Sequence, residues 1–207
     1  ILRNEKYIRI VRVFAWMRRW LEKARGNQPE SDELTSVELR LAEDKLFSNA
    51  QERHFGQEIE NVKCGKQLPQ RSLLSGLNPK YNEGRGILLV GGRLQESGLP
   101  ETSRHPIILP DKDELTEKLV MHVHLKNHHS AQETTIAILN QNYFVIHCRQ
   151  VVRKILHACL TCKRHRSQAG GQQMGNLPEE RTSVALAFAD VGLDFTGYLN
   201  IKEGDAI

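Results

Sequence analysis

The spacing of apolar residues over residues 5–25 predicts an amphipathic helix. Ile8, Val11 and Ala15 recur at intervals of three or four residues, with basic side chains mostly on the other faces. Gly26 follows the pattern closely, and glycine is a common residue just past the end of a helix. This segment is therefore predicted to pack one face against another part of the chain.

A second helix is predicted for residues 35–57. Thr35 and Glu38 have the spacing of a capping box, in which each side chain hydrogen-bonds to the backbone of the other residue at a helix N-terminus. We interpret residues 1–60 as a helical connector. Residues 61–85, rich in Gly, Pro and polar residues, are interpreted as a linker.

Short apolar runs separated by glycine-rich turns predict a small β unit over residues 86–110. The runs are residues 87–90 and 105–110, each of a length typical of short strands, and residues 91–94 are a candidate for a third. From residue 113 the period of the apolar positions changes back to that of helices.

Three short helices are predicted between residues 113 and 166. The first ends near Lys126, the second carries Leu139 and Tyr143 on one face, and the third includes Val151. Together they predict a three-helix bundle similar to a helix-turn-helix. A bundle of about fifty residues buries little apolar area, so a metal ion or a partner is expected to stabilise it.

Two histidines and two cysteines in this bundle have the spacing of zinc ligands. His124 and His128 lie four residues apart, so on a helix both imidazoles project from one face, and Cys159 and Cys162 form a C-x-x-C pair. Two nitrogen and two sulfur donors make a closed tetrahedral set suited to structural Zn²⁺. We predict a zinc-stapled domain over residues 111–166.

Other histidines and cysteines are weaker candidates for the zinc site. His122 lies six residues before His128, and on a continuous helix His129 faces away from His124. Cys64 and Cys148 stand apart from the motif and are assigned no chemistry.

The charge distribution favours an anionic partner. The net charge is only +4, but six basic residues and no acidic one fall between residues 134 and 178. Such a stretch suits a phosphate backbone, although a solvated basic face explains any single charge run equally well. The candidate nucleic-acid contacts are Arg149, Arg153, Lys154, Lys163, Arg164 and Arg166.

The sequence excludes a membrane-spanning role and favours an intracellular protein. Its longest apolar run, residues 184–189, is far shorter than the roughly 18 residues that a spanning helix needs. No secretory signal is recognisable, and the C-x-x-C pair is typical of a reducing compartment. Because the chain begins at Ile1 rather than Met, we expect a piece of a longer polypeptide.

Asp194 interrupts the apolar segment of residues 191–197, which is predicted to form a strand. A carboxylate in such a strand is costly to bury unless it is hydrogen-bonded or metal-bound, so Asp194 is a candidate Mg²⁺ ligand. An Asp before a Gly near a strand end is also a common turn former. The residue pattern alone leaves both interpretations open.

These motifs together resemble the integrase region of retrotransposon polyproteins, most closely those of the BEL/Pao type. H-x-x-x-H followed by C-x-x-C is similar to the HHCC zinc-binding domain of retroviral and retrotransposon integrases. Several flanking segments agree with the family, although His129-Ser130-Ala131 lacks the glycine of the family's His-x-Gly. The agreeing segments are residues 86–94, His105-Pro106-Ile107-Ile108-Leu109-Pro110, Tyr143-Phe144-Val145-Ile146 and Met174-Gly175-Asn176-Leu177-Pro178.

The resemblance implies a fold, a chemistry and a set of partners. Residues 167–183 would be a linker, and residues 184–207 the start of a truncated RNase H-like α/β core with Asp194 as its first catalytic acid. In such cores three carboxylates hold two Mg²⁺ or Mn²⁺ ions during strand transfer. The other acids would lie beyond Ile207, so we expect the isolated chain to be inactive. Integrases act as homo-oligomers on DNA in the nucleus.

Two other functions are compatible with the sequence. One is a non-catalytic, zinc-dependent module derived from a retroelement that binds protein or DNA. The other is a helix-turn-helix DNA-binding protein in which zinc only stabilises the fold and the third helix reads the sequence.

Overall fold

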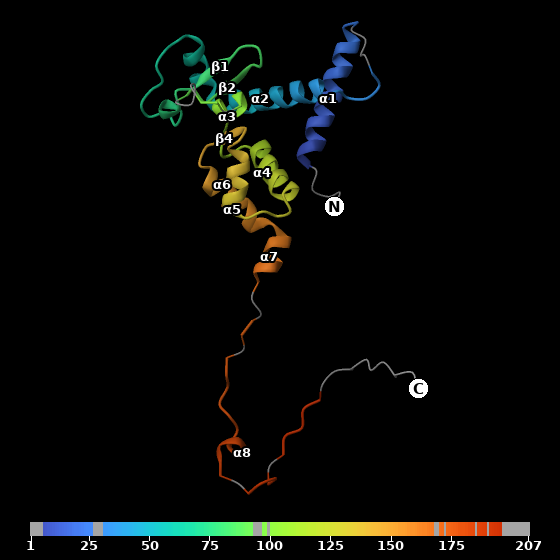
Figure 1. Ribbon diagram of the computed structural model, residues 1–207, viewed down its shortest axis with the longest axis vertical. Coiled ribbons are helices and arrows are strands. Elements are labelled where there is room, and N and C mark those ends of the chain that lie inside the picture. Colours follow the sequence, from blue (N-terminus) through green and yellow to red (C-terminus); the bar gives the residue numbers. More distant parts are fainter. Residues whose placement is uncertain are drawn as a thin grey trace. The chain divides into compact units, whose positions relative to one another are not determined.

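The computed structural model shows a mainly helical chain with one small sheet (Figure 1). It describes residues 6–26, 31–92, 97–98, 100–167, 170–171, 173–184, 186–189 and 191–195. The chain divides into two compact units, residues 1–167 and residues 168–207, and each is described by itself below. None of the described helices is long and apolar enough to cross a membrane.

The elements of the first unit begin with two long helices and continue with short strands and helices. In chain order they are α1 (Lys6–Ala24), α2 (Ser36–Lys63), the 3-10 turn η2 (Ser75–Leu77), β1 (Lys80–Asn82), β2 (Ile87–Leu89), α3 (Glu101–Arg104), β3 (Ile107–Leu109), α4 (Glu114–Lys126), α5 (Gln132–Leu139), β4 (Tyr143–Val145), α6 (Cys148–Ala158) and α7 (Leu160–Arg166).

Helices α1 and α2 form where the sequence predicts them. One face of α1 buries Tyr7, Val11 and Ala15 against α2 and α4. The predicted capping box opens α2: the Glu38 amide donates to the Thr35 hydroxyl, and the Thr35 amide donates to the Glu38 carboxylate. Both predicted helices are therefore confirmed. The prediction that placed Ile8 on the buried face of α1 is wrong, because Ile8 is exposed and Tyr7 is buried with Val11 and Ala15.

A buried arginine joins the end of α1 to the start of α2. The Arg19 guanidinium donates to both carboxylate oxygens of Glu38, at 2.7 and 2.5 Å, and to three backbone carbonyls of residues 31–33. A buried charge is tolerated only when it is paired and hydrogen-bonded, and every nitrogen of this guanidinium has an acceptor. Arg19 thus fixes the turn between the helices.

We expect the α1–α2 pair to weaken in acid, because hydrogen bonds from Arg19 and from the Thr35 backbone lower the pKa of Glu38 to about 2. A folded-state pKa below the unfolded value contributes stability that is complete above pH 4.5 and is lost as the pH falls through 2. Urea denaturation followed by tryptophan fluorescence at pH 7, 4 and 2.5 measures this loss. Glu38→Gln should lower stability at pH 7 and flatten its pH dependence.

The matched control for this measurement is Glu60→Gln, which changes an exposed carboxyl on the same helix. It should follow the wild-type profile throughout. Equal pH dependence of the Glu38→Gln variant and the wild type would contradict the assignment.

The sheet has the order β1-β2-β3-β4. The first three strands pair antiparallel, and β3 pairs with β4 in parallel, with Ile107 opposite Tyr143 and Leu109 opposite Val145. Strands β2 and β3 confirm the two predicted apolar runs. The prediction that placed Tyr143 on a helix is wrong: α5 ends at Leu139, and the β-branched and aromatic residues that follow pair with β3 instead.

A buried glutamine fastens α2 to this sheet. The Gln51 amide nitrogen donates to the carbonyls of Leu88 and Ile108, at 2.8 and 2.7 Å, and its oxygen accepts from the Leu88 amide at 2.7 Å. These backbone groups belong to the two central strands. One side chain therefore satisfies three buried polar groups that the short strands leave unpaired.

The zinc-motif helices share their core with the rest of the first unit. Helices α4, α5 and α6 pack on one another, and their apolar residues are continuous with those of α1, α2 and the sheet. Residues 140–147, including β4, separate α5 from α6. This differs from a helix-turn-helix, in which a turn of three or four residues joins the two helices.

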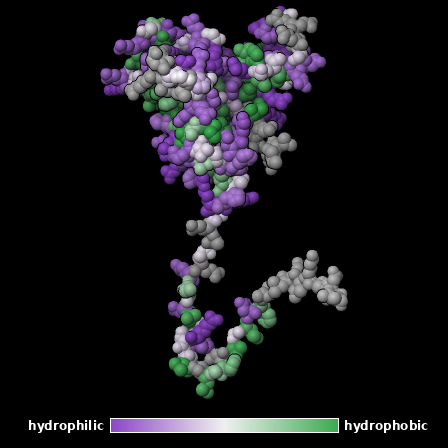
Figure 2. Space-filling view, viewed as in Figure 1, coloured by the Kyte–Doolittle hydropathy of each residue, from purple (hydrophilic) through white to green (hydrophobic). Residues whose placement is uncertain are grey.

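In the second unit the described residues are largely exposed. Its helix α8 (Glu179–Thr182) is one turn long. The sequence predicts a strand at residues 191–195, but the structure has neither helix nor strand there. None of the strands of the described chain pairs with these residues. Residues 196–207, which include the end of that predicted strand, lie outside the described residues. Val184, Phe188 and Phe195 are among the exposed large hydrophobic residues of this unit. Figure 2 shows hydrophobic surface along its described part.

Candidate metal centre

Helix α4 supplies the first ligand of the centre. His124 is fully buried on its last turn. Its Nδ1 lies 3.0 Å from the carbonyl of Ser130, an acceptor, so Nδ1 carries the proton and donates. That hydrogen bond fixes the tautomer and leaves the Nε2 lone pair free for a metal ion.

The second histidine of the centre is His129, and the prediction of His128 is corrected. Helix α4 ends at Lys126, and His128 and His129 both adopt left-handed backbone conformations, with φ of 53° and 59°. The four-residue helical spacing therefore no longer applies beyond the helix end. The His129 amide donates to the His124 carbonyl at 2.9 Å, which turns its side chain toward His124, while His128 is exposed.

The two cysteines lie where α6 gives way to α7. Cys159 has an extended backbone between the helices and Cys162 lies one turn into α7, so both thiols are buried and face the histidines. Cys159 Sγ lies 3.3 Å from His129 Nδ1, and Cys162 Sγ lies 3.3 Å from His124 Nε2. Both cysteines are free thiols.

The four ligand atoms lie close enough together to share one tetrahedral zinc ion. All lie within 4.8 Å of one another, and His129 Nδ1 is 3.2 Å from His124 Nε2 and 3.6 Å from Cys162 Sγ. A tetrahedral zinc with bonds of about 2.0–2.3 Å holds its ligand atoms about 3.3–3.8 Å apart. The imidazole rings stand at 88° to each other with their centroids 5.0 Å apart, so the two rings do not stack. The donor set fits structural zinc.

Burial makes the zinc affinity of this centre depend on pH. It lowers the pKa of His124, with a further contribution from His129, and so favours the neutral imidazole that binds zinc. Burial and the neighbouring Cys159 raise the pKa of Cys162, so in the metal-free protein this group is a thiol. Zinc needs the thiolate and must displace that proton, so zinc affinity falls as the pH falls.

A second layer of hydrogen bonds holds the turn that carries His129. Thr135 is buried on α5, and its hydroxyl donates to the carbonyl of Ala131 at 2.9 Å. It also lies 3.0 Å from the Ser130 hydroxyl. The Ser130 carbonyl in turn accepts the His124 proton. Helix α5 therefore orients a zinc ligand without touching the metal position.

The predicted nucleic-acid contacts fall into two groups. The first group, on α6, is already paired with carboxylates. Arg149 makes a bidentate ion pair with Glu133, at 2.7 and 3.0 Å, and Lys154 pairs with Glu117 at 2.8 Å. The other group is exposed like the first and consists of Arg153 on α6 and Lys163, Arg164 and Arg166 on α7. The α7 residues immediately follow the centre, and the charge of Arg166 contributes to the lowered pKa of His124.

The other candidates do not join the centre. Asp194 is exposed in the second unit. Burial raises the pKa of Cys148, which is half-buried on α6, and Cys64 is exposed. Among the described residues, His124, His129, Cys159 and Cys162 form the one group of His, Cys, Asp and Glu side chains arranged to hold a metal ion.

Comparison with known proteins agrees with this geometry. Residues 111–168 match the family model described as the integrase zinc binding domain. This confirms the predicted zinc-binding domain. Comparison of the chain with curated proteins and with solved structures found no significant match.

The sequence held a signal for His129 that the helical spacing hid. That signal is the adjacent histidine itself: His129 directly follows His128 and begins His129-Ser130-Ala131, the segment that corresponds to the family's His-x-Gly. Helical spacing favoured His128 because it assumed that α4 continues through residue 128.

Proposed function

We propose that this chain is part of a retroelement integrase, related to those of BEL/Pao elements, whose zinc-binding domain supports DNA binding and multimerisation. The observation that carries the proposal is the four-ligand centre within residues 111–168, the segment that matches the integrase zinc binding domain. The closed donor set leaves zinc no vacant position for substrate, so its role is structural.

The exposed basic end of α7 is the proposed DNA contact. Lys163, Arg164 and Arg166 follow the second cysteine, and the metal fixes the start of their helix. Exposed side chains are free to neutralise phosphates and release counterions. Arg149 and Lys154 already have carboxylate partners, so their contribution to DNA binding is expected to be smaller.

Replacing Lys163, Arg164 and Arg166 together with alanine should weaken duplex DNA binding and reduce its salt dependence. Each lost phosphate contact lowers the slope of log K against log salt by about 0.9. Three contacts therefore remove nearly three units of slope. Fluorescence anisotropy with a labelled duplex between 50 and 200 mM salt measures both effects on the zinc-loaded chain.

Arg149→Ala is the matched control, because it removes an exposed arginine that is already paired with Glu133. It should change the slope little. If the triple variant binds DNA with the wild-type slope, or if the wild-type affinity does not vary with salt, the proposed contact is wrong.

Asp194 is proposed as the first catalytic acid of the integrase core. The support is the family resemblance of residues 191–197. In a complete core, two further carboxylates would share Mg²⁺ or Mn²⁺ with it. The residues of this chain then provide the zinc-binding domain and the start of the catalytic domain.

A zinc-dependent module that binds protein rather than DNA is the second candidate function. The ion pairs of Arg149 and Lys154 favour it, because they give the basic face of α6 a structural role. The same DNA titration separates the two functions: weak binding without salt dependence favours the protein-binding module.

A further inference from the structure

Helix α1 carries a second apolar face, away from the one that packs into the core. Its buried face has residues spaced by four, Tyr7, Val11 and Ala15. The second face, here called the α1 stripe, has the alternating spacing of three and four that a helix needs to pack along another helix. It consists of Ile10, Val13, Met17, Trp20 and Ala24.

Most of the α1 stripe is exposed. Val13 is 51% exposed, Met17 57% and Trp20 68%, although these side chains are among the larger apolar ones. Figure 2 shows hydrophobic surface in this region, at the upper right of the view. Single exposed apolar residues are ordinary, but a contiguous row at helix-packing spacing marks an interaction surface.

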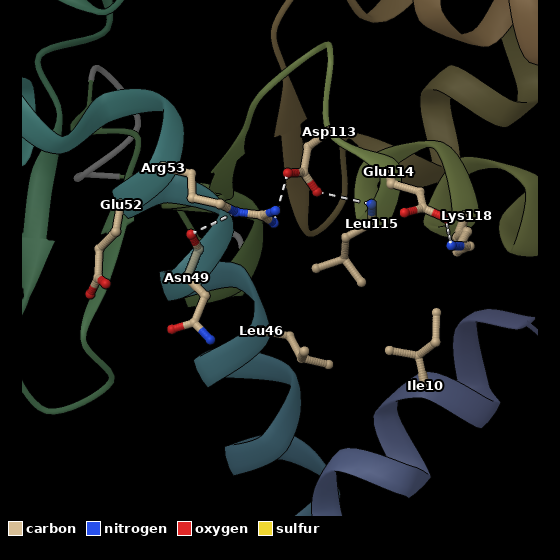
Figure 3. A pocket seen from close by; sticks show the side chains of 9 residues that line it. All are labelled: Ile10, Leu46, Asn49, Glu52, Arg53, Asp113, Glu114, Leu115 and Lys118. Carbon is tan, nitrogen blue, oxygen red and sulfur yellow. Dashed lines mark hydrogen bonds and ion pairs between the residues drawn. The ribbon is translucent and has the colours of Figure 1, made fainter.

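The N-terminal half of the stripe forms one wall of a groove. Two adjoining hollows, of about 640 and 450 Å³, share Ile10 of α1, Leu46 of α2 and Lys118 of α4. Figure 3 shows Ile10, Leu46 and Leu115 pointing into the first hollow from three different helices. The surface is therefore concave, with an apolar floor.

The charges around the stripe are mainly basic. Residues 6–24 carry six basic side chains and one acidic side chain, Glu22. Arg9 and Lys23 each directly precede a stripe residue, so both lie along the same edge of the stripe. Both side chains are exposed. Deeper in the groove the charges are already paired, Lys118 with Glu114 and Arg53 with Asp113.

We propose that the α1 stripe and its groove bind an amphipathic helix of a partner protein whose apolar face is flanked by acidic residues. The heptad-like spacing of the stripe favours a helical partner, and the basic residues along its edge favour a partner with acidic residues beside its apolar face. The proposal does not depend on the zinc-binding function, because none of the zinc ligands lines the groove.

Charge and shape argue against two other occupants. A second copy packed stripe to stripe would bring two strongly basic helices together, and like charges across an interface are costly. A lipid surface is flat, whereas this surface is hollowed.

The probe for the test is a fluorescein-labelled synthetic peptide of three heptads, with leucine at the core positions and glutamate at the flanks. Binding to the zinc-loaded full chain is measured by anisotropy. We expect the acidic peptide to bind, a version with lysine in place of each glutamate to bind at least tenfold more weakly, and Met17→Glu to weaken the acidic peptide at least tenfold.

Leu73→Glu is the matched control, because it places the same charge at an exposed apolar residue outside the stripe. It should bind the acidic peptide like the wild type, and circular dichroism should show Met17→Glu equally folded. The proposal would be overturned if the acidic and basic peptides bound with equal affinity, or if Met17→Glu bound the acidic peptide as tightly as the wild type. So would stripe-dependent self-association in sedimentation, or stripe-dependent binding to phosphatidylserine vesicles, without binding of the acidic peptide.

Discussion

Replacing His129 with alanine should abolish stoichiometric zinc binding, whereas replacing His128 should leave it intact. His129 Nδ1 lies 3.2–3.6 Å from three other ligand atoms, while His128 is exposed at the helix end. Loss of an outer hydrogen bond to a ligand costs about 10–100-fold in metal affinity, so loss of the ligand itself costs at least that much.

The structure also limits what zinc removal should unfold. Helices α4 and α6 contribute to a core shared with α1, α2 and the sheet, and none of the four zinc ligands belongs to that core. Helix α7 has only seven residues, and its buried residue is the ligand Cys162. Chelation, or Cys159→Ser with Cys162→Ser, should therefore melt α7 and the turn at residues 127–131 and leave α2 folded.

Metal analysis and hydrogen exchange together check this expectation. The wild type and His128→Ala should hold one zinc per chain and protect the amides of α7, and His129→Ala should do neither. The assignment fails if His128→Ala loses zinc and His129→Ala retains it. Complete unfolding of the first unit on chelation would show that the shared core is weaker than its burial implies.

Replacing Gln51 with leucine should destabilise the first unit by about 3 kcal/mol or more. The change leaves the carbonyls of Leu88 and Ile108 and the Leu88 amide without their partner in the core. A buried polar group deprived of its hydrogen bond costs about 1–3 kcal/mol, and three such groups are involved. A leucine of similar size does not compensate, because the lost contacts are polar.

Urea denaturation of the zinc-loaded protein, followed by circular dichroism, measures this loss as a lower midpoint. Gln57→Leu is the matched control, since Gln57 is exposed on the same helix, and it should change stability by less than about 0.5 kcal/mol. Similar midpoints for the two variants would show that the Gln51 contacts contribute little.

Local sequence signals predicted the long helices and the two central strands well and the two edge strands poorly. The capping box at Thr35 and the apolar spacing of α1 are contained within their own segments, so the sequence alone was sufficient. Strands β1 and β4 are three residues long and exist because β2 and β3 lie beside them. Such pairing is a long-range property that no local pattern records.

The same distinction applies to the metal centre. The C-x-x-C pair needs only local geometry, and both cysteines are correctly predicted to share a site. The second histidine depends on where α4 ends, and two consecutive left-handed residues decided that. Non-glycine residues seldom adopt this conformation, so a prediction based on regular helix geometry could not anticipate it.

The parallel pairing of β3 with β4 affects how this protein can be dissected. The segment that matches the integrase zinc binding domain begins at residue 111, but the strand that pairs with Tyr143–Val145 is Ile107–Leu109. Expressing residues 111–168 alone would uncover the edge of β4 and the apolar residues beneath α1 and α2. Unpaired strand edges and newly exposed cores promote aggregation. A recombinant fragment intended for biophysics should therefore start before α1, because the boundary of the recognisable module is not a boundary of independent folding.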